Sequence, residues 1–282
     1  MDRSRQGTIG EAVRLEGIGL HTGRLQRITL RPAPPDTGIL FRRTDLGTPS
    51  ILGAGRPIRA TLDAVSGTAG RISLGGEDGV QTVEHLLSAA WAAGVDNLDV
   101  EIEGTEVPGM DGSALPFVRA LRAVGVRSQD AARPALRVRE PVWVGNGHSL
   151  AVALPAPRFR VACLVTLDAP SGEDQAATDD PASERYEEVI APARTWGYER
   201  DAETLRRRGL ALGASLENTL VIGGAGYLNP PRFHNEAARH KILDLLGDLA
   251  LLGGDIQGHV IAVRAGHSLH VALARALRDR EG

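Results

Sequence analysis

The feature that most limits the possible folds of this 282-residue chain is a pattern that occurs twice. Each copy has an apolar segment of helical spacing that ends at glycine, an alternating strand, a glycine turn and a closing helix. These segments are residues 83–94, 98–102, 112–113 and 116–123 in the first copy, and 239–254, 259–263, 266–268 and 271–277 in the second. Residues 12–15 also match 135–138, and 32–34 match 155–157, at one constant offset. We therefore predict an α+β fold with internal duplication.

The duplication predicts two similar domains, each a sheet plus two helices, over residues 1–126 and 135–282. The polar stretch 127–134 is the expected linker. Within the second domain, residues 169–190 are rich in Asp, Glu, Ala, Ser and Pro, which predicts an insert. If the two domains pack about an approximate twofold axis, the helix layer of one meets the helix layer of the other. The first residues of equivalent helices then lie close together.

Composition narrows the function classes. The chain is 42% hydrophobic and 24% charged with a net charge of -3, so it reads as globular, with no electrostatic reason to expect nucleic acid. Cys163 is alone, which excludes a disulfide framework and a thiolate zinc site. No signal-like start and no run of about 18 apolar residues is present, so no transmembrane segment and a cytoplasmic location are expected. We expect a monomer.

Polar residues on the second apolar helix indicate a metal site. His240 and Asp244 are one helical turn apart and leave the same face, which Asp248 extends by another turn. A surface ion pair is the commoner cause of this spacing. Here the apolar surroundings favour a bound ion, because buried polar groups need a partner. Imidazole and carboxylate suit Zn²⁺, and a catalytic zinc needs a third protein ligand.

The duplication supplies that ligand. His85 starts the helix equivalent to that of His240, so His85, His240 and Asp244 are expected to form one three-ligand site with room for water. Glu84 is then a carboxylate beside the metal without being bound to it, as a general base in a zinc hydrolase would be. Trp196 and Tyr198 are close enough to line a pocket, although core packing is the commoner use of such rings.

Short motifs along nearly the whole chain carry a family resemblance. They are GLHTG at 19–23, RPAP at 31–34, RRTD at 42–45, TVEHL at 82–86, VPGMDGS at 107–113, ARTWG at 193–197, RHKILDLLGDL at 239–249 and AGHSL at 265–269. In this order they resemble the UDP-3-O-acyl-N-acetylglucosamine deacetylases, the zinc amidases that commit a sugar nucleotide to lipid A biosynthesis. The resemblance implies two sheet-and-helix domains packed helix layer to helix layer, each with an insert near the active site.

The resemblance also implies the reaction. Zinc-bound water would attack the N-acetyl group of UDP-3-O-acyl-N-acetylglucosamine to give acetate and the free amine. His85, His240 and Asp244 match the family's zinc ligands, and Glu84 matches its general base. His267 matches a histidine that acts as general acid and oxyanion stabiliser.

Further roles follow from the same resemblance. Asp248 matches the carboxylate that orients that histidine, Thr195 a hydroxyl near the oxyanion, and Lys241 a lysine that contacts substrate. His21 corresponds to a residue associated with a second, inhibitory zinc ion. Trp196 stands where phenylalanine is common, so its larger ring is expected to narrow the sugar or acyl site.

Two alternatives stay open on the sequence. One is a zinc amidase of this architecture acting on another N-acylated sugar, which the divergent segment 169–188 permits because the family builds its acyl passage in this region. The other is a non-catalytic binding protein, for example one that binds RNA. Solvated side chains are expected at His148, His234, His259 and His270.

Overall fold

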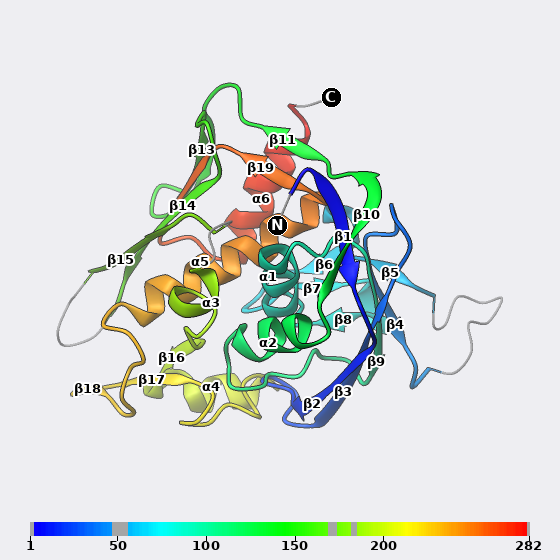
Figure 1. The fold of residues 1–282 in the computed structure, drawn as a ribbon. Helices are drawn as coiled ribbons and strands as arrows, with labels where there is room; N and C mark the ends of the chain where they lie inside the picture. The colour runs from blue at the N-terminus through cyan, green and yellow to red at the C-terminus, as the bar shows by residue number, and fades with distance from the viewer. Residues whose placement is uncertain (1–2, 47–55, 169–173, 182–184, 281–282) are drawn as a thin grey trace.

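Two five-stranded sheets of the same topology form the outer layers of the molecule (Figure 1). The computed structural model describes residues 3–46, 56–168, 174–181 and 185–280. The first sheet has the order β2 (Val13–Ile18), β3 (Leu25–Pro32), β9 (Leu98–Glu103), β4 (Ile39–Arg43) and β5 (Ile58–Arg59). Strand β4 is parallel to β9, and the other pairs are antiparallel. In the chain, helix α1 (Glu84–Ala93) comes after β5 and before β9, and helix α2 (Leu115–Ala123) comes after β9.

The second sheet repeats this arrangement. Its order is β12 (Val142–Gly145), β13 (Leu150–Leu154), β20 (His259–Val263), β14 (Arg160–Thr166) and β15 (Asp174–Asp179). Strand β14 is parallel to β20, in the position that β4 holds beside β9. Helices α5 (Glu236–Leu249) and α6 (His267–Arg278) take the places of α1 and α2. The mixed α+β class is confirmed, and the matching strand order supports the internal duplication.

The sequence placed an insert near residues 169–190, and the structure places the additional elements elsewhere. Residues 174–179 are β15, an edge strand of the second sheet and the counterpart of β5. Its outward residues are polar or small, and only Gln175 and Ala177 are buried, so it lacks an apolar strand pattern. Residues 169–173 and 182–184 lie outside the described part of the chain, and 186–189 form α3 (Tyr186–Val189).

Two small three-stranded sheets instead occupy equivalent places before α1 and α5. The first contains β6 (Val65–Gly67), β7 (Ser73–Leu74) and β8 (Val80–Gln81). The second contains β16 (Trp196–Tyr198), β17 (Leu220–Gly223) and β18 (Gly226–Tyr227), with α4 (Ala202–Arg207) between its first two strands. These sheets are the additions to the repeated unit, whereas residues 174–179 belong to the unit itself.

The expected linker at 127–134 is mostly a strand. β10 (Val126–Ala132) pairs antiparallel with β1 (Arg5–Ile9), and β11 (Ala135–Arg137) pairs parallel with β19 (Asp255–Gln257). All seven residues of β10 are exposed or half-buried, so the strand carries no apolar face and its sequence resembles that of a loop. The match of residues 135–138 to 12–15 was therefore wrong: the counterpart of β2 is β12, since Val13 pairs with Leu30 and Val142 with Ala153.

The helices of the two repeats meet between the sheets, with α1 against α5 (Figure 1). Leu86 and Leu87 of α1 and Leu243 and Leu246 of α5 are fully buried there. The two backbones approach so closely at Gly247 that a Cβ atom at this position would lie 2.1 Å from the carbonyl oxygen of Glu84. Only glycine permits this distance. Within the described residues, no helix is both long and apolar enough to cross a membrane.

The close approach at Gly247 predicts a large effect of one methyl group. We expect Gly247→Ala to lower the free energy of unfolding by about 2 kcal/mol or more, because the backbone of α1 must move to relieve the overlap. Urea denaturation measures this loss. Gly224→Ala is the matched control, since a Cβ atom at Gly224 meets nothing within 4 Å. Equal stability of the two variants would show that the helices do not depend on this contact.

Candidate active site

Three buried donor atoms converge where α1 meets α5. His85 is the second residue of α1, and His240 and Asp244 lie one turn apart on α5. Nε2 of His240 is 3.3 Å from Oδ1 of Asp244, and Nε2 of His85 is 3.8 Å from the same oxygen. The two imidazole rings are edge to face, with centroids 5.1 Å apart. One ligand atom from each residue lies within 4.8 Å of the others, so the three can hold one metal ion.

Neighbouring groups prepare these donors for a cation. Nδ1 of His240 lies 3.0 Å from the carbonyl oxygen of Ala193, so that nitrogen carries the proton and leaves Nε2 free to bind. Nζ of Lys241 donates to Oδ2 of Asp244 at 2.8 Å, which leaves Oδ1 toward the histidines. Burial, and then the charge of His240, lower the pKa of His85 to about 3. Neutral imidazoles and an ionised carboxylate are the states that bind a divalent ion.

Glu84 lies beside these ligands in a different environment. The side chain is buried at the first residue of α1, and its Oε2 accepts a hydrogen bond of 3.1 Å from the backbone N–H of Ile72. Burial raises the pKa of Glu84 to about 7, which the charge of His267 partly opposes. A carboxyl group of this pKa can both take and release a proton near neutral pH.

A second buried group consists of Asp248, His267 and His270. Nδ1 of His267 lies 2.9 Å from Oδ2 of Asp248, and Nδ1 of His270 lies 2.8 Å from the same oxygen. Burial would lower the pKa of His267, but the charge and hydrogen bond of Asp248 outweigh it and raise the pKa to about 9. His267 is therefore a cation at neutral pH, with its Nε2 available to a substrate.

His270 is a residue whose environment sequence reasoning missed. We expected a solvated side chain, but His270 is completely buried and its Nε2 has no hydrogen-bond partner among the described residues. Burial lowers its pKa, so it donates to Asp248 as a neutral ring. The available signal was its position three residues after His267, which puts both rings on one face of α6. His148 and His234 are exposed and His259 is half-buried.

A cavity of about 360 Å³ collects these groups. Of the predicted site residues it is lined by His21, Glu84, His85, Thr195, Trp196, His240, Lys241, Asp244 and His267. Tyr198 does not line it. Its ring packs edge to face on Trp196 at 5.7 Å, while its hydroxyl oxygen accepts from the backbone N–H of Asp168 at 2.7 Å in a neighbouring hollow.

His21 comes from the hairpin loop between β2 and β3 and is half-buried at the cavity. Its Nδ1 accepts a hydrogen bond of 3.3 Å from the backbone N–H of Ala211. Burial lowers the pKa of His21, and the charge of Glu106 opposes this effect. The ring is thus neutral, with its proton on Nε2, and lines the same cavity as the three convergent ligands.

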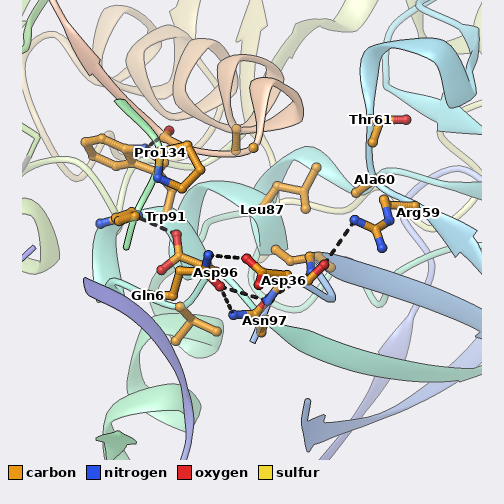
Figure 2. Close-up of a pocket in the computed structure, with 17 residues that line it drawn as sticks. Gln6, Asp36, Arg59, Ala60, Thr61, Leu87, Trp91, Asp96, Asn97 and Pro134 are labelled. Atoms are coloured by element: carbon orange, nitrogen blue, oxygen red, sulfur yellow. Dashed lines mark hydrogen bonds and ion pairs between the residues drawn. The ribbon is translucent and has the colours of Figure 1, made fainter. Parts of the chain in front are cut away.

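A separate cavity of about 250 Å³ lies at the carboxyl end of α1 (Figure 2). Trp91 and Leu87 line it together with polar groups, among them the ion pair of Arg133 with Asp96 at 2.8 Å. Asn97 donates to Gln6 at 2.8 Å in the same place. None of the predicted site residues lines this cavity, so the chemistry belongs to the site between α1 and α5.

Sequence comparison relates the chain to a family of known proteins. The family model for UDP-3-O-acyl N-acetylglycosamine deacetylase (LpxC) matches residues 6–279. The chain belongs to this family. Among its relatives is the UDP-3-O-acyl-N-acetylglucosamine deacetylase of Myxococcus xanthus, which is 42% identical over 96% of this chain and 85% of its own.

Two other deacetylases of that name are equally similar. The protein of Thermosynechococcus vestitus is 42% identical over 98% of this chain and 94% of its own. The protein of Marinobacter nauticus is also 42% identical, over 98% of this chain and 91% of its own. The deacetylase family resemblance inferred from the short motifs is confirmed.

The raised pKa of His267 predicts how stability depends on pH. Because the folded value of about 9 exceeds the ordinary 6.5, the Asp248 contact stabilises the fold fully below pH 6.5, and this contribution is lost as pH rises through about 9. The shift corresponds to an effect on the order of 3 kcal/mol. Between pH 6 and 9.5, urea denaturation should show a larger fall for the parent than for His267→Gln. Replacement of the exposed His148 by Gln should leave the parent's pH dependence unchanged, and a parallel fall in all three proteins contradicts the assignment.

Proposed function

We propose that this protein hydrolyses the N-acetyl group of UDP-3-O-acyl-N-acetylglucosamine to acetate and the free amine. The observation that carries the proposal is the convergence of His85, His240 and Asp244 with Glu84 and His267 on one cavity. The chain belongs to the deacetylase family and is 42% identical to a protein named UDP-3-O-acyl-N-acetylglucosamine deacetylase, and this name is the basis for the proposed substrate. We take the ion to be zinc, because two imidazoles and one carboxylate are a ligand set typical of catalytic zinc.

His85, His240 and Asp244 would hold the ion. When bound there, it would polarise the amide carbonyl and lower the pKa of a water molecule. Glu84 accepts a proton as the water oxygen adds to the carbonyl carbon, and its pKa of about 7 suits this transfer near neutral pH. His267 is a cation at that pH, and its positive charge stabilises the negative charge that develops on the carbonyl oxygen.

Collapse of the adduct breaks the C–N bond. An amine anion is a very poor leaving group, so the nitrogen must receive a proton as the bond breaks. We assign this proton to His267, which Asp248 both orients and keeps charged through the 2.9 Å hydrogen bond. Thr195, Trp196 and Lys241 line the cavity and are assigned to the substrate. Tyr198 is assigned only an indirect role, because it supports Trp196 from outside the cavity.

The division of roles predicts different defects in two variants. Glu84→Gln should keep stoichiometric zinc and lose about two to four orders of magnitude in kcat, because the base is removed and the ligands remain. His240→Ala should lose both the metal and the activity. Elemental analysis together with deacetylation assays measures the two properties. A Glu84→Gln variant with parental kcat would overturn the assignment of Glu84.

The nearest alternative is an amidase for another N-acylated sugar. Deacetylation of UDP-3-O-acyl-N-acetylglucosamine and of UDP-N-acetylglucosamine, measured side by side, separates the two. We expect at least a hundredfold higher kcat/KM for the acylated substrate, since binding energy from the acyl chain is used in the transition state. Equal rates on the two compounds would favour the alternative.

A further inference from the structure

The carboxylate of Asp248, which holds His267, is shared with a second histidine. Nδ1 of His267 lies 2.9 Å from Oδ2 of Asp248 and 3.1 Å from Oδ1. Nδ1 of His270 lies 2.8 Å from Oδ2. Asp248 and His270 are completely buried, and His267 is nearly so. Two donors from α6 thus meet one acceptor from α5, where the two helices pack together (Figure 1).

The contact with His267 alone leaves the rotation of the carboxylate weakly defined. Its Nδ1 is almost equally far from two equivalent oxygen atoms, so a rotation about the Cβ–Cγ bond of Asp248 exchanges one acceptor for the other. The hydrogen bond from His270 is made to Oδ2, and its ring is inclined by 75° to the ring of His267. Because the two donors approach from different directions, together they fix the plane of the carboxylate.

The other ring nitrogen of His270 gains nothing from the fold. Nε2 is buried and has no hydrogen-bond partner among the described residues. Burial lowers the pKa of His270, so the ring is neutral, and Nδ1 carries the proton that it donates to Asp248. Nε2 is then an acceptor without a donor, which costs free energy of unfolding. Leucine would avoid this cost, so what histidine provides at this position is the donor to Asp248.

His270 lies behind the active site and not in it. The cavity of about 360 Å³ is lined by His267 and Ser268 of α6, but neither His270 nor Asp248 is among its lining residues. An effect of His270 on the reaction must therefore pass through Asp248 and His267. Loss of a group that orients a functional side chain typically costs about 10- to 100-fold in activity.

We propose that His270 is a positioning residue for the deacetylation. Its hydrogen bond to Oδ2 fixes the carboxylate of Asp248, and the fixed carboxylate holds the ring of His267 with Nε2 toward the reacting amide. Proton transfer to the departing nitrogen requires this alignment, because a donor slightly out of place transfers its proton far more slowly. The role rests on the proposed function for its chemical step, and on the geometry of α5 and α6 for its structural step.

Two variants of the same shape isolate this hydrogen bond. Leucine and asparagine branch alike, but only asparagine carries an amide nitrogen, in the place that Nδ1 takes on histidine. His270→Leu should lower kcat about 10- to 100-fold and leave KM and the zinc content unchanged, since the cavity lining is intact. His270→Asn should restore most of kcat. His270→Ala gives the same comparison with asparagine if the leucine variant does not fold. Deacetylation assays and elemental analysis measure these properties.

A double-mutant cycle shows whether the effect passes through His267. In the His267→Gln background, His270→Leu should lower kcat by less than about twofold more, because the group that it positions is already absent. A general disturbance of the site would lower kcat by the same factor in both backgrounds. Leu273→Ala is the matched control for packing, since Leu273 is completely buried on α6 and does not line the cavity. It should lower Tm and leave the kcat of the folded protein unchanged.

A measurement without substrate separates this proposal from the proposed activity. In protein labelled with ¹⁵N-histidine, the Nδ1–H proton of His267 should give an NMR signal that is protected from exchange with water. The signal should persist in His270→Asn and be broadened or lost in His270→Leu. A parent without deacetylase activity would overturn the proposed function, and the signal would still decide whether His270 fixes the Asp248–His267 pair.

Four results would overturn the proposal. They are a parental kcat in His270→Leu, equal losses in His270→Leu and His270→Asn, an unchanged His267 signal in His270→Leu, and an undiminished effect of His270→Leu in the His267→Gln background. Asp248, His267 and His270 also lie close enough together to hold an ion. Loss of one equivalent of bound metal in His270→Leu would assign the three residues to a metal site, and this result too would overturn the positioning role.

Discussion

The closeness of α1 and α5 is the constraint on which the active site depends. The two helices belong to different repeats, and each alone offers an incomplete set of ligands: His85 from one, His240 and Asp244 from the other. The absence of a side chain at Gly247 lets the carbonyl of Glu84 approach α5. This contact lies one turn beyond Asp244, so the packing of the helices and the spacing of the ligands are set by the same few residues.

Three buried carboxylates lie close together at the active site, and their neighbours give them different pKa values. Glu84 is buried and accepts a hydrogen bond from one backbone N–H, and burial raises its pKa to about 7. Burial acts on Asp244 and Asp248 too, but His240 and Lys241 beside Asp244, and His267 beside Asp248, outweigh it and lower both pKa values. A residue type therefore does not determine its role. The charged and hydrogen-bonding neighbours of each carboxylate separate a proton acceptor from a ligand and from an orienting group.

Sequence reasoning located the site better than it located the edges of the fold. The helical spacing of His240 and Asp244 and the repeat that pairs them with His85 depend on strong apolar patterns, which burial enforces. β15 and β10 lack such patterns, since they are an edge strand and a polar pairing strand, and both were read as irregular. His270 was missed for another reason: its burial follows from the packing of α6 against the sheet and α5, and the sequence signals it only through the three-residue spacing from His267.

The central claim is that both repeats contribute ligands to one ion, and anomalous diffraction at the metal absorption edge of the crystallised protein tests it most directly. The account predicts one catalytic peak bonded to Nε2 of His85, Nε2 of His240 and Oδ1 of Asp244. A peak bonded only to residues of α5, or an ion held at Asp248, His267 and His270 with the three proposed ligands left apart, would contradict it.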